Sequence, residues 1–141
     1  MKKTVLLTLS VLSIFFVVGC GKKETKKVLP LEDDKLITNN NIEVLKEVEI
    51  DGIKISDIAI IKEENITTVS ASVTNVTNEV IFLDSVNVTY EFEDGTTSMI
   101  NLLVDTPIVT QQVVQTSSST TDDLTKAVKV SYNLVKMKDN Q

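Results

Sequence analysis

Carboxylates are the main candidates for chemistry in this sequence, because its 141 residues contain no histidine. Histidine is the usual general base and the commonest metal ligand, so triads of the Ser-His-Asp and Cys-His types are excluded. Glu91 and Glu93 stand two positions apart in a strand-like stretch, and side chains with that spacing point the same way. The pair could transfer protons together, or it could line the solvated face of a sheet. We expect the solvated face and no catalytic residue.

A second acidic pair, Asp122 and Asp123, directly precedes the apolar residue Leu124. An aspartate in this position caps a helical turn by accepting a hydrogen bond from a backbone N–H, and we expect that role. A weak Ca²⁺ site that includes Asp94 is the alternative, although the sequence contains nothing like an EF-hand calcium loop. We therefore predict no bound metal and no cofactor.

The single cysteine, Cys20, excludes an internal disulfide and follows a segment with the layout of an export signal. Lys2 and Lys3 form a short positive region, and residues 5–18 form an uncharged, apolar region. This apolar run is shorter than the about 20 residues that a membrane-spanning helix needs. The layout predicts a cleavable signal over residues 1–19, with an uncleaved transmembrane helix as the alternative.

The run Val17-Val18-Gly19-Cys20 resembles the lipobox, the motif that marks bacterial lipoproteins. The resemblance implies cleavage between Gly19 and Cys20 and attachment of a diacylglyceryl group to the Cys20 sulfur. The residue suits this chemistry, because a thiolate is a strong nucleophile. Two acyl chains, at about 0.8 kcal/mol per buried CH₂, hold a protein firmly at a bilayer. We expect a lipid anchor on the extracytoplasmic face of the cell membrane; a free cysteine after ordinary cleavage is the alternative.

The segment after Cys20 is polar and has few residues that could form a core. Residues 21–27 include four lysines, and Asn39-Asn40-Asn41 is a further break. We expect a flexible linker over residues 20–41. The whole chain has a formal net charge of −6 and contains no arginine. An acidic body of this kind repels phosphate backbones, so a nucleic-acid partner is not expected.

Residues 42–141 have the pattern of an all-β domain. They are rich in Val, Ile and Thr, whose branched side chains suit a pleated surface. Strands are expected at residues 66–73, 80–93, 96–105, 112–121 and 128–134, preceded by shorter ones from residue 47 onward. Tight turns are expected at Asp51-Gly52, Glu64-Asn65 and Asp94-Gly95, with a break at Thr106-Pro107. The spacing favours an immunoglobulin-like β-sandwich of about seven strands.

Two irregularities are visible within these strands. The apolar residues change parity between Ile55 and Ile58, which predicts a β-bulge near Ser56-Asp57. Asp84 interrupts an apolar face that otherwise runs from Phe82 to Phe92, and it indicates a bulge or a sheet edge.

Three stretches carry a resemblance to a known family: residues 69–77, 93–96 and 121–127. They resemble the immunoglobulin-like domains, often called FxLYD-type, of surface lipoproteins in Gram-positive bacteria. The sequence has no literal F-x-L-Y-D run. Domains of this family are extracytoplasmic modules without a common catalytic site, so the resemblance implies a β-sandwich and assigns no residue roles.

These features favour a non-enzymatic binding or interaction module that is tethered to the membrane. The Ser/Thr-rich stretch Gln115–Thr121 is expected to be an edge strand, and it is either a binding edge or an ordinary solvated strand. A passive spacer of the cell envelope is the alternative function. A hydrolase that uses Glu91 and Glu93 is the remote alternative.

Overall fold

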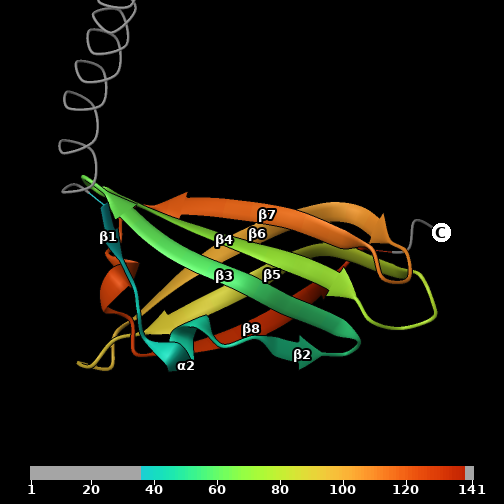
Figure 1. Cartoon of the computed structure of the whole chain (residues 1–141), viewed down its shortest axis with the longest axis horizontal. Helices are drawn as coiled ribbons and strands as arrows, with labels where there is room; N and C mark the ends of the chain where they lie inside the picture. Colours follow the sequence, from blue (N-terminus) through green and yellow to red (C-terminus); the bar gives the residue numbers. More distant parts are fainter. Residues whose placement is uncertain (1–35, 139–141) are drawn as a thin grey trace, which may run out of the picture. The chain divides into compact units, whose positions relative to one another are not determined.

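The computed structural model describes residues 36–138, which form two antiparallel β-sheets packed face to face (Figure 1). The helical turn α2 (Ile42–Leu45) lies between β1 and β2, and the 3₁₀ turn η2 (Leu124–Lys126) lies between β7 and β8. The strands are β1 (Leu36–Thr38), β2 (Val48–Ile50), β3 (Ile53–Glu63), β4 (Ile66–Asn75), β5 (Ile81–Glu91), β6 (Thr97–Ile108), β7 (Val113–Thr120) and β8 (Lys129–Lys136).

One sheet has the strand order β1-β3-β4-β7, with β2 also paired to β3, and the other has the order β6-β5-β8. The chain changes sheets between β4 and β5, between β6 and β7, and between β7 and β8. This is the connectivity of strands A, B and E against C′, C and F in an immunoglobulin-like sandwich. The predicted all-β sandwich is confirmed, with β1 and β2 as additional short strands. Within residues 36–138, no strand lies beside β8 in the position of strand G.

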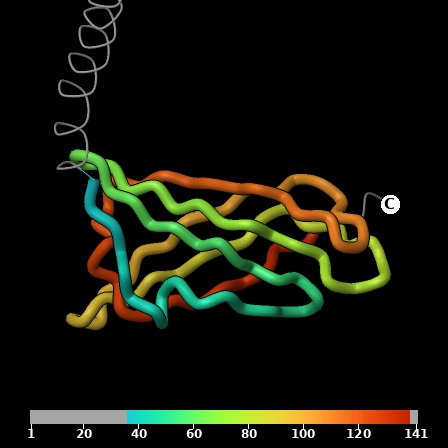
Figure 2. The backbone as a smooth tube through the Cα atoms, in the orientation of Figure 1, coloured from blue at the N-terminus to red at the C-terminus, as the bar shows by residue number. Residues whose placement is uncertain are grey.

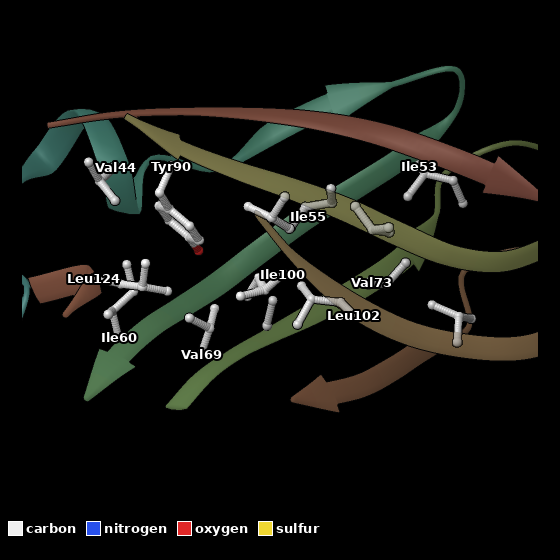
Figure 3. Close-up of a cluster of buried hydrophobic side chains, with 14 of the residues drawn as sticks. Val44, Ile53, Ile55, Ile60, Val69, Val73, Tyr90, Ile100, Leu102 and Leu124 are labelled. Atoms are coloured by element: carbon white, nitrogen blue, oxygen red, sulfur yellow. The ribbon is translucent and has the colours of Figure 1, made fainter. Parts of the chain in front are cut away.

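The core lies between the sheets and consists mainly of aliphatic side chains (Figure 3). Removing apolar surface from water contributes about 25 cal/mol per Å² and is the main favourable term in folding. Tyr90 is the largest of the fully buried residues. Both sheets contribute to this cluster, with Ile53, Ile55, Ile60, Val69 and Val73 from one and Val86, Val88, Tyr90, Ile100 and Leu102 from the other.

The bulge predicted in β3 is confirmed. The pairing of β3 with β4 shifts between Ser56 and Ala59, and Asp57 has a φ angle of 51°. The extra residue exchanges the two faces of the strand, so Ile55 and Ile60 both point into the core despite their opposite parity.

The irregularity predicted at Asp84 is also confirmed, because the pairing of β5 with both neighbours shifts between Leu83 and Ser85. The continuous apolar face expected from Phe82 to Phe92 is wrong. Leu83 is fully buried, whereas Phe82 is 54% exposed. The bulge exchanges the faces of β5, so residues before Asp84 alternate out of phase with those after it.

The break expected at Thr106-Pro107 is wrong, because β6 continues to Ile108. Pro107 lies opposite Phe82 of β5, and β5 is the one neighbour that β6 has among the described strands. Proline is tolerated in an edge strand, where no second neighbour needs its missing N–H.

Residues 36–41, expected to belong to the linker, are already part of the sandwich. β1 pairs with β3, and Asn39 is only 4% exposed. The Asn39 backbone N–H donates to the Ile60 carbonyl at 3.1 Å, and its Nδ2 donates to the carbonyls of Leu124 and Ala127 at 3.0 and 3.2 Å. Composition favoured a linker here because asparagine is typical of loops, but the backbone and side chain of Asn39 together join this segment to β3 and to the η2 region.

The loops at residues 51–52, 75–80 and 109–112 meet at the end of the sandwich opposite Asn39 and η2 (Figure 2). We call this end the loop end. The turn at Asp51-Gly52 joins β2 to β3 as predicted, with φ angles of 49° and 80°. Two successive positive φ angles define the type I′ turn that suits a two-residue hairpin.

Gly52 is constrained by its neighbours as well as by its φ angle. A Cβ atom added there would lie 2.2 Å from Thr77 Cγ2, whereas one added at Gly95, with φ of 83°, would meet nothing within 4 Å. Gly52→Ala should therefore lower the free energy of unfolding by about 2–4 kcal/mol, from backbone strain and overpacking together. Gly95→Ala should cost only the strain, about 1–2 kcal/mol. Urea denaturation of both variants measures the difference, and equal losses would contradict the close approach to Thr77.

Candidate functional site

The residues predicted to carry the lipid, Gly19 and Cys20, lie outside the described residues. The lipid attachment and the cleavage therefore stay predictions. In the described part of the chain, no helix is long and apolar enough to cross a membrane.

Glu91 and Glu93 are separated by the end of a strand. Glu91 is the last residue of β5, and its carboxylate lies 3.7 Å from the Lys129 ammonium. Glu93 belongs to the exposed turn that follows, so the expectation that both project from one strand face is wrong. The sequence pattern missed this because it continued the strand to Glu93, whereas β5 ends at Glu91. These two carboxylates form no shared site.

Asp122 and Asp123 form a polar corner between β7 and β8. Asp123 caps η2 as predicted, by accepting a hydrogen bond from the Thr125 backbone N–H at 3.2 Å. Its carboxylate also accepts from Lys62 Nζ at 2.7 Å. Asp122 accepts from the Ser98 hydroxyl at 2.5 Å. The two carboxylates thus bind η2 to β3 and β6, which is a structural role.

The hydrogen bond from Lys62, followed by that from the Thr125 hydroxyl, lowers the pKa of Asp123 below its ordinary value of 3.8. A carboxyl group whose pKa is lower in the folded state stabilises the fold above its ordinary pKa. That contribution is lost as the pH falls through the folded-state pKa. The Lys62–Asp123 pair should therefore support the fold at neutral pH but not in acid.

Asp123→Asn keeps a capping side chain and removes the charge, because asparagine caps as well as aspartate. We expect it to lower the free energy of unfolding at pH 7 by at most about 1 kcal/mol, since the pair is partly exposed. The difference from the parent protein should shrink as the pH falls below 3.8. Urea titrations at several pH values measure it. The same loss should be absent in a Lys62→Met background, and a loss that is independent of pH would contradict the assignment to charge.

Asp94 stabilises the turn between β5 and β6. It accepts hydrogen bonds from the Thr96 backbone N–H at 3.0 Å and the Thr96 hydroxyl at 2.6 Å, and these bonds lower its pKa. Asp94, Asp122 and Asp123 do not form a common cluster. Among residues 36–138, no group of three or more carboxylate or thiol ligands could hold a metal ion.

The Ser/Thr-rich stretch Gln115–Thr121 lies largely in β7, which is an edge strand as predicted. Its side chains mainly join neighbouring strands. Gln115 Nε2 donates to the Ser72 hydroxyl at 2.7 Å, and the Ser119 hydroxyl lies 2.9 Å from that of Thr68. Thr116 is buried and donates to the Leu103 carbonyl of β6 at 2.7 Å. This edge is therefore linked to the opposite sheet.

A hollow with a volume of about 720 Å³ lies at the loop end. We call it the loop-end hollow. Its apolar lining includes Val80 and Phe82, which are 46% and 54% exposed. Asp51, Glu79 and Lys136 add charges around these side chains. Such a mixture of exposed apolar surface and a few charged groups is typical of binding surfaces.

Comparisons with known proteins add little to this picture. No protein-family model matches the chain, and no curated protein shows significant sequence similarity to it. Among solved structures, the chain is similar to a DUF1425 family member from Shewanella sp. pv-4, with 12% identity and a TM-score of 0.41. The similarity covers 67% of this chain and 90% of the other. At this level it assigns neither a family nor a function.

The wall of the loop-end hollow is held in shape by Asn75, which is fully buried. Its Nδ2 donates to the carbonyls of Glu79 and Ile108 at 2.6 and 2.7 Å, and its Oδ1 accepts from the Thr77 backbone N–H at 2.9 Å. Sequence reasoning did not identify this hollow, because its walls come from three segments that are distant in the sequence: residue 51, residues 77–82 and residues 136–137. The exposed side chain of Phe82 is the one feature of the sequence that could have indicated the hollow. Its exposure can be predicted only if the position of the bulge at Asp84 is known.

Proposed function

We propose that this chain is a lipid-anchored, non-enzymatic binding module on the extracytoplasmic face of the cell membrane. The lipobox-like run that ends at Cys20 supports the anchor, together with the signal-like segment before it. The FxLYD-type stretches support an extracytoplasmic module. In this proposal the Cys20 sulfur carries the lipid and residues 21–35 connect it to the sandwich.

The exposed apolar lining of the loop-end hollow is the observation that carries the binding role. The described chain begins at β1, and Asn39 fixes this part of the chain to Ile60 and η2. The loop-end hollow is lined by Val80 and Phe82, and both side chains are exposed. Exposed apolar side chains gathered in a hollow are typical of a surface that binds a partner.

The partners of the carboxylates support the proposal that the module is not an enzyme. Asp94, Asp122 and Asp123 hold turns and corners, and Glu91 lies near Lys129. Because each has a structural partner and the sequence contains no histidine, binding explains the described residues better than acid–base chemistry does.

The lipid anchor is tested by Cys20→Ser. We expect the parent protein, extracted from membranes, to have an intact mass that corresponds to residue 20 as the N-terminus with acyl chains attached. The Ser variant cannot form the thioether, so it should lack the acyl mass and no longer fractionate as a lipid-modified protein. An unchanged mass and an unchanged detergent-phase fractionation would contradict the proposal.

Binding at the loop end is tested by a photo-crosslinking amino acid placed at Val80 in living cells. We expect one reproducible crosslinked partner, because Val80 lies exposed on the loop-end hollow. The matched control carries the same amino acid at Thr68, which is exposed on β4 away from this hollow. Crosslinks that are absent, or equal at both positions, would favour a passive spacer of the envelope.

A further inference from the structure

Three asparagines form a row across the outer face of the sheet in which β5 lies between β6 and β8 (Figure 1). Asn87 of β5 lies opposite Asn101 of β6 on one side and opposite Asn133 of β8 on the other. Asn101 and Asn133 are exposed, and Asn87 is half-buried. Asparagine is uncommon in strands, because its side chain competes with the backbone for hydrogen bonds. Its presence at the same position in three paired strands therefore needs a reason other than strand formation.

Two of these carboxamides are already held in place. Asn101 Nδ2 donates to Asn87 Oδ1 at 2.7 Å, which orients both groups. Each carboxamide has two N–H donors and an oxygen that accepts, so this bond uses only part of what the pair offers. The Asn101 oxygen and the exposed Asn133 carboxamide face solvent. The row therefore presents oriented donors and acceptors that a ligand can reach.

The surroundings of the row are uncharged. The neighbouring positions on the same face are Met99, Thr89 and Ser131 on one side, and Leu103, Ser85 and Val135 on the other. The next row beyond Met99 contains the charged residues Glu91 and Lys129. In a chain with 24% charged residues and a net charge of −6, three rows without a charge form a distinct surface. A charged partner would find no opposite charge here, so the surface suits an uncharged one.

Apolar side chains stand on both sides of the Asn101 carboxamide. Met99 and Leu103 lie two residues before and after it on β6, so they share its face of the sheet. Met99 is 67% exposed and Leu103 is 60% exposed. Binding sites commonly combine apolar surface with a few placed polar groups. An amide between two apolar groups is complementary to an acetamido group, which consists of an N–H, a carbonyl and a methyl group.

We infer that this surface binds an uncharged glycan that carries acetamido groups. We call it the asparagine face, and it consists of Asn87, Met99, Asn101, Leu103 and Asn133. Strands about 4.8 Å apart place the carboxamides at a spacing close to the length of one sugar ring. The glycan therefore lies across the strands, along the row.

In this arrangement the carboxamides exchange hydrogen bonds with acetamido and hydroxyl groups of the glycan. Met99 and Leu103 contact its methyl groups and the apolar faces of its rings. An open sheet face suits a polymer, because a small ligand usually needs a concave site to bury its surface. The asparagine face is separate from the loop-end hollow, so the inference adds a second binding surface to the proposed function.

The ligand class is tested with the detergent-extracted full chain and chitohexaose, the uncharged hexamer of N-acetylglucosamine, labelled with a fluorophore at one end. We expect binding in fluorescence anisotropy. Cellohexaose has hydroxyl groups in place of the acetamido groups, so it should compete at least about tenfold less well. No binding of chitohexaose, or equal competition by the two hexamers, would overturn the inference.

The role of the row is tested by Asn133→Thr. Threonine suits a strand, and the hydrogen bond between Asn101 and Asn87 does not involve this residue, so the sheet should be retained. We expect chitohexaose to bind about fivefold more weakly, because one amide is lost. Asn65→Thr is the matched control, since Asn65 is exposed in the turn between β3 and β4. Urea denaturation shows that both variants fold, and equal affinities of the two variants would contradict the inference.

The apolar contacts are tested by Met99→Ser with Leu103→Ser, which should weaken binding about tenfold. Val109→Ser with Val113→Ser is the control. These valines are 52% and 53% exposed and lie off the asparagine face, so their loss should have little effect. Equal losses in the two double variants would mean that the asparagine face is not the binding surface.

A second copy of the chain is the other occupant that such a row could accept, because carboxamides can pair with one another. A dimer in analytical ultracentrifugation that Asn133→Thr makes monomeric, without binding of chitohexaose, would assign the face to that copy and overturn the inference. Crosslinking at Val80 tests the loop-end hollow by itself. A failure at the asparagine face is therefore distinguishable from a failure of the proposed function.

Discussion

A single buried carboxamide, that of Asn75, holds the loop end of this protein together. A buried amide that lacked partners would cost about 1–3 kcal/mol, so each of its hydrogen bonds fixes the position of the group it reaches. Here those groups are the Glu79 carbonyl in the loop between β4 and β5, the Ile108 carbonyl at the end of β6, and the Thr77 backbone N–H. The loop-end hollow depends on this arrangement. Asn39 acts in the same way at the other end, on the carbonyls of Leu124 and Ala127.

Both asparagines show where the sequence was informative and where it was not. Alternation of apolar residues and the Asp-Gly turns were sufficient for the sandwich, because they are local signals that the two sheets reinforce. The parity change at Ser56-Asp57 even located a bulge. Asn39 and Asn75, by contrast, look like ordinary turn residues, and their value comes from carbonyls more than 30 positions away in the chain. No local pattern contains that information.

The errors have the same origin. One extra residue at Asp84 exposed Phe82 and buried Leu83, because a strand has a period of two and any insertion exchanges its faces. Pro107 was expected to break the strand. A strand can contain proline if it lies at the edge of a sheet, and whether β6 is an edge strand is a property of the whole sheet. For the site, residue types identified the capping role of Asp123 but not the hollow or the asparagine face. Those arise from segments that only the fold brings together.

The hydrogen bond between Thr116 and the Leu103 carbonyl has a consequence for how these domains behave when crowded. A sandwich with unpaired strand edges on both flanks could pair with a neighbouring copy on each side. Such association has no end point and produces fibres. Where β6 and β7 meet, their edges are joined to each other, so this flank does not offer a free edge for such pairing. Within residues 36–138, the edges of β6 and β7 that meet at this hydrogen bond are therefore less accessible to a strand of a neighbouring copy.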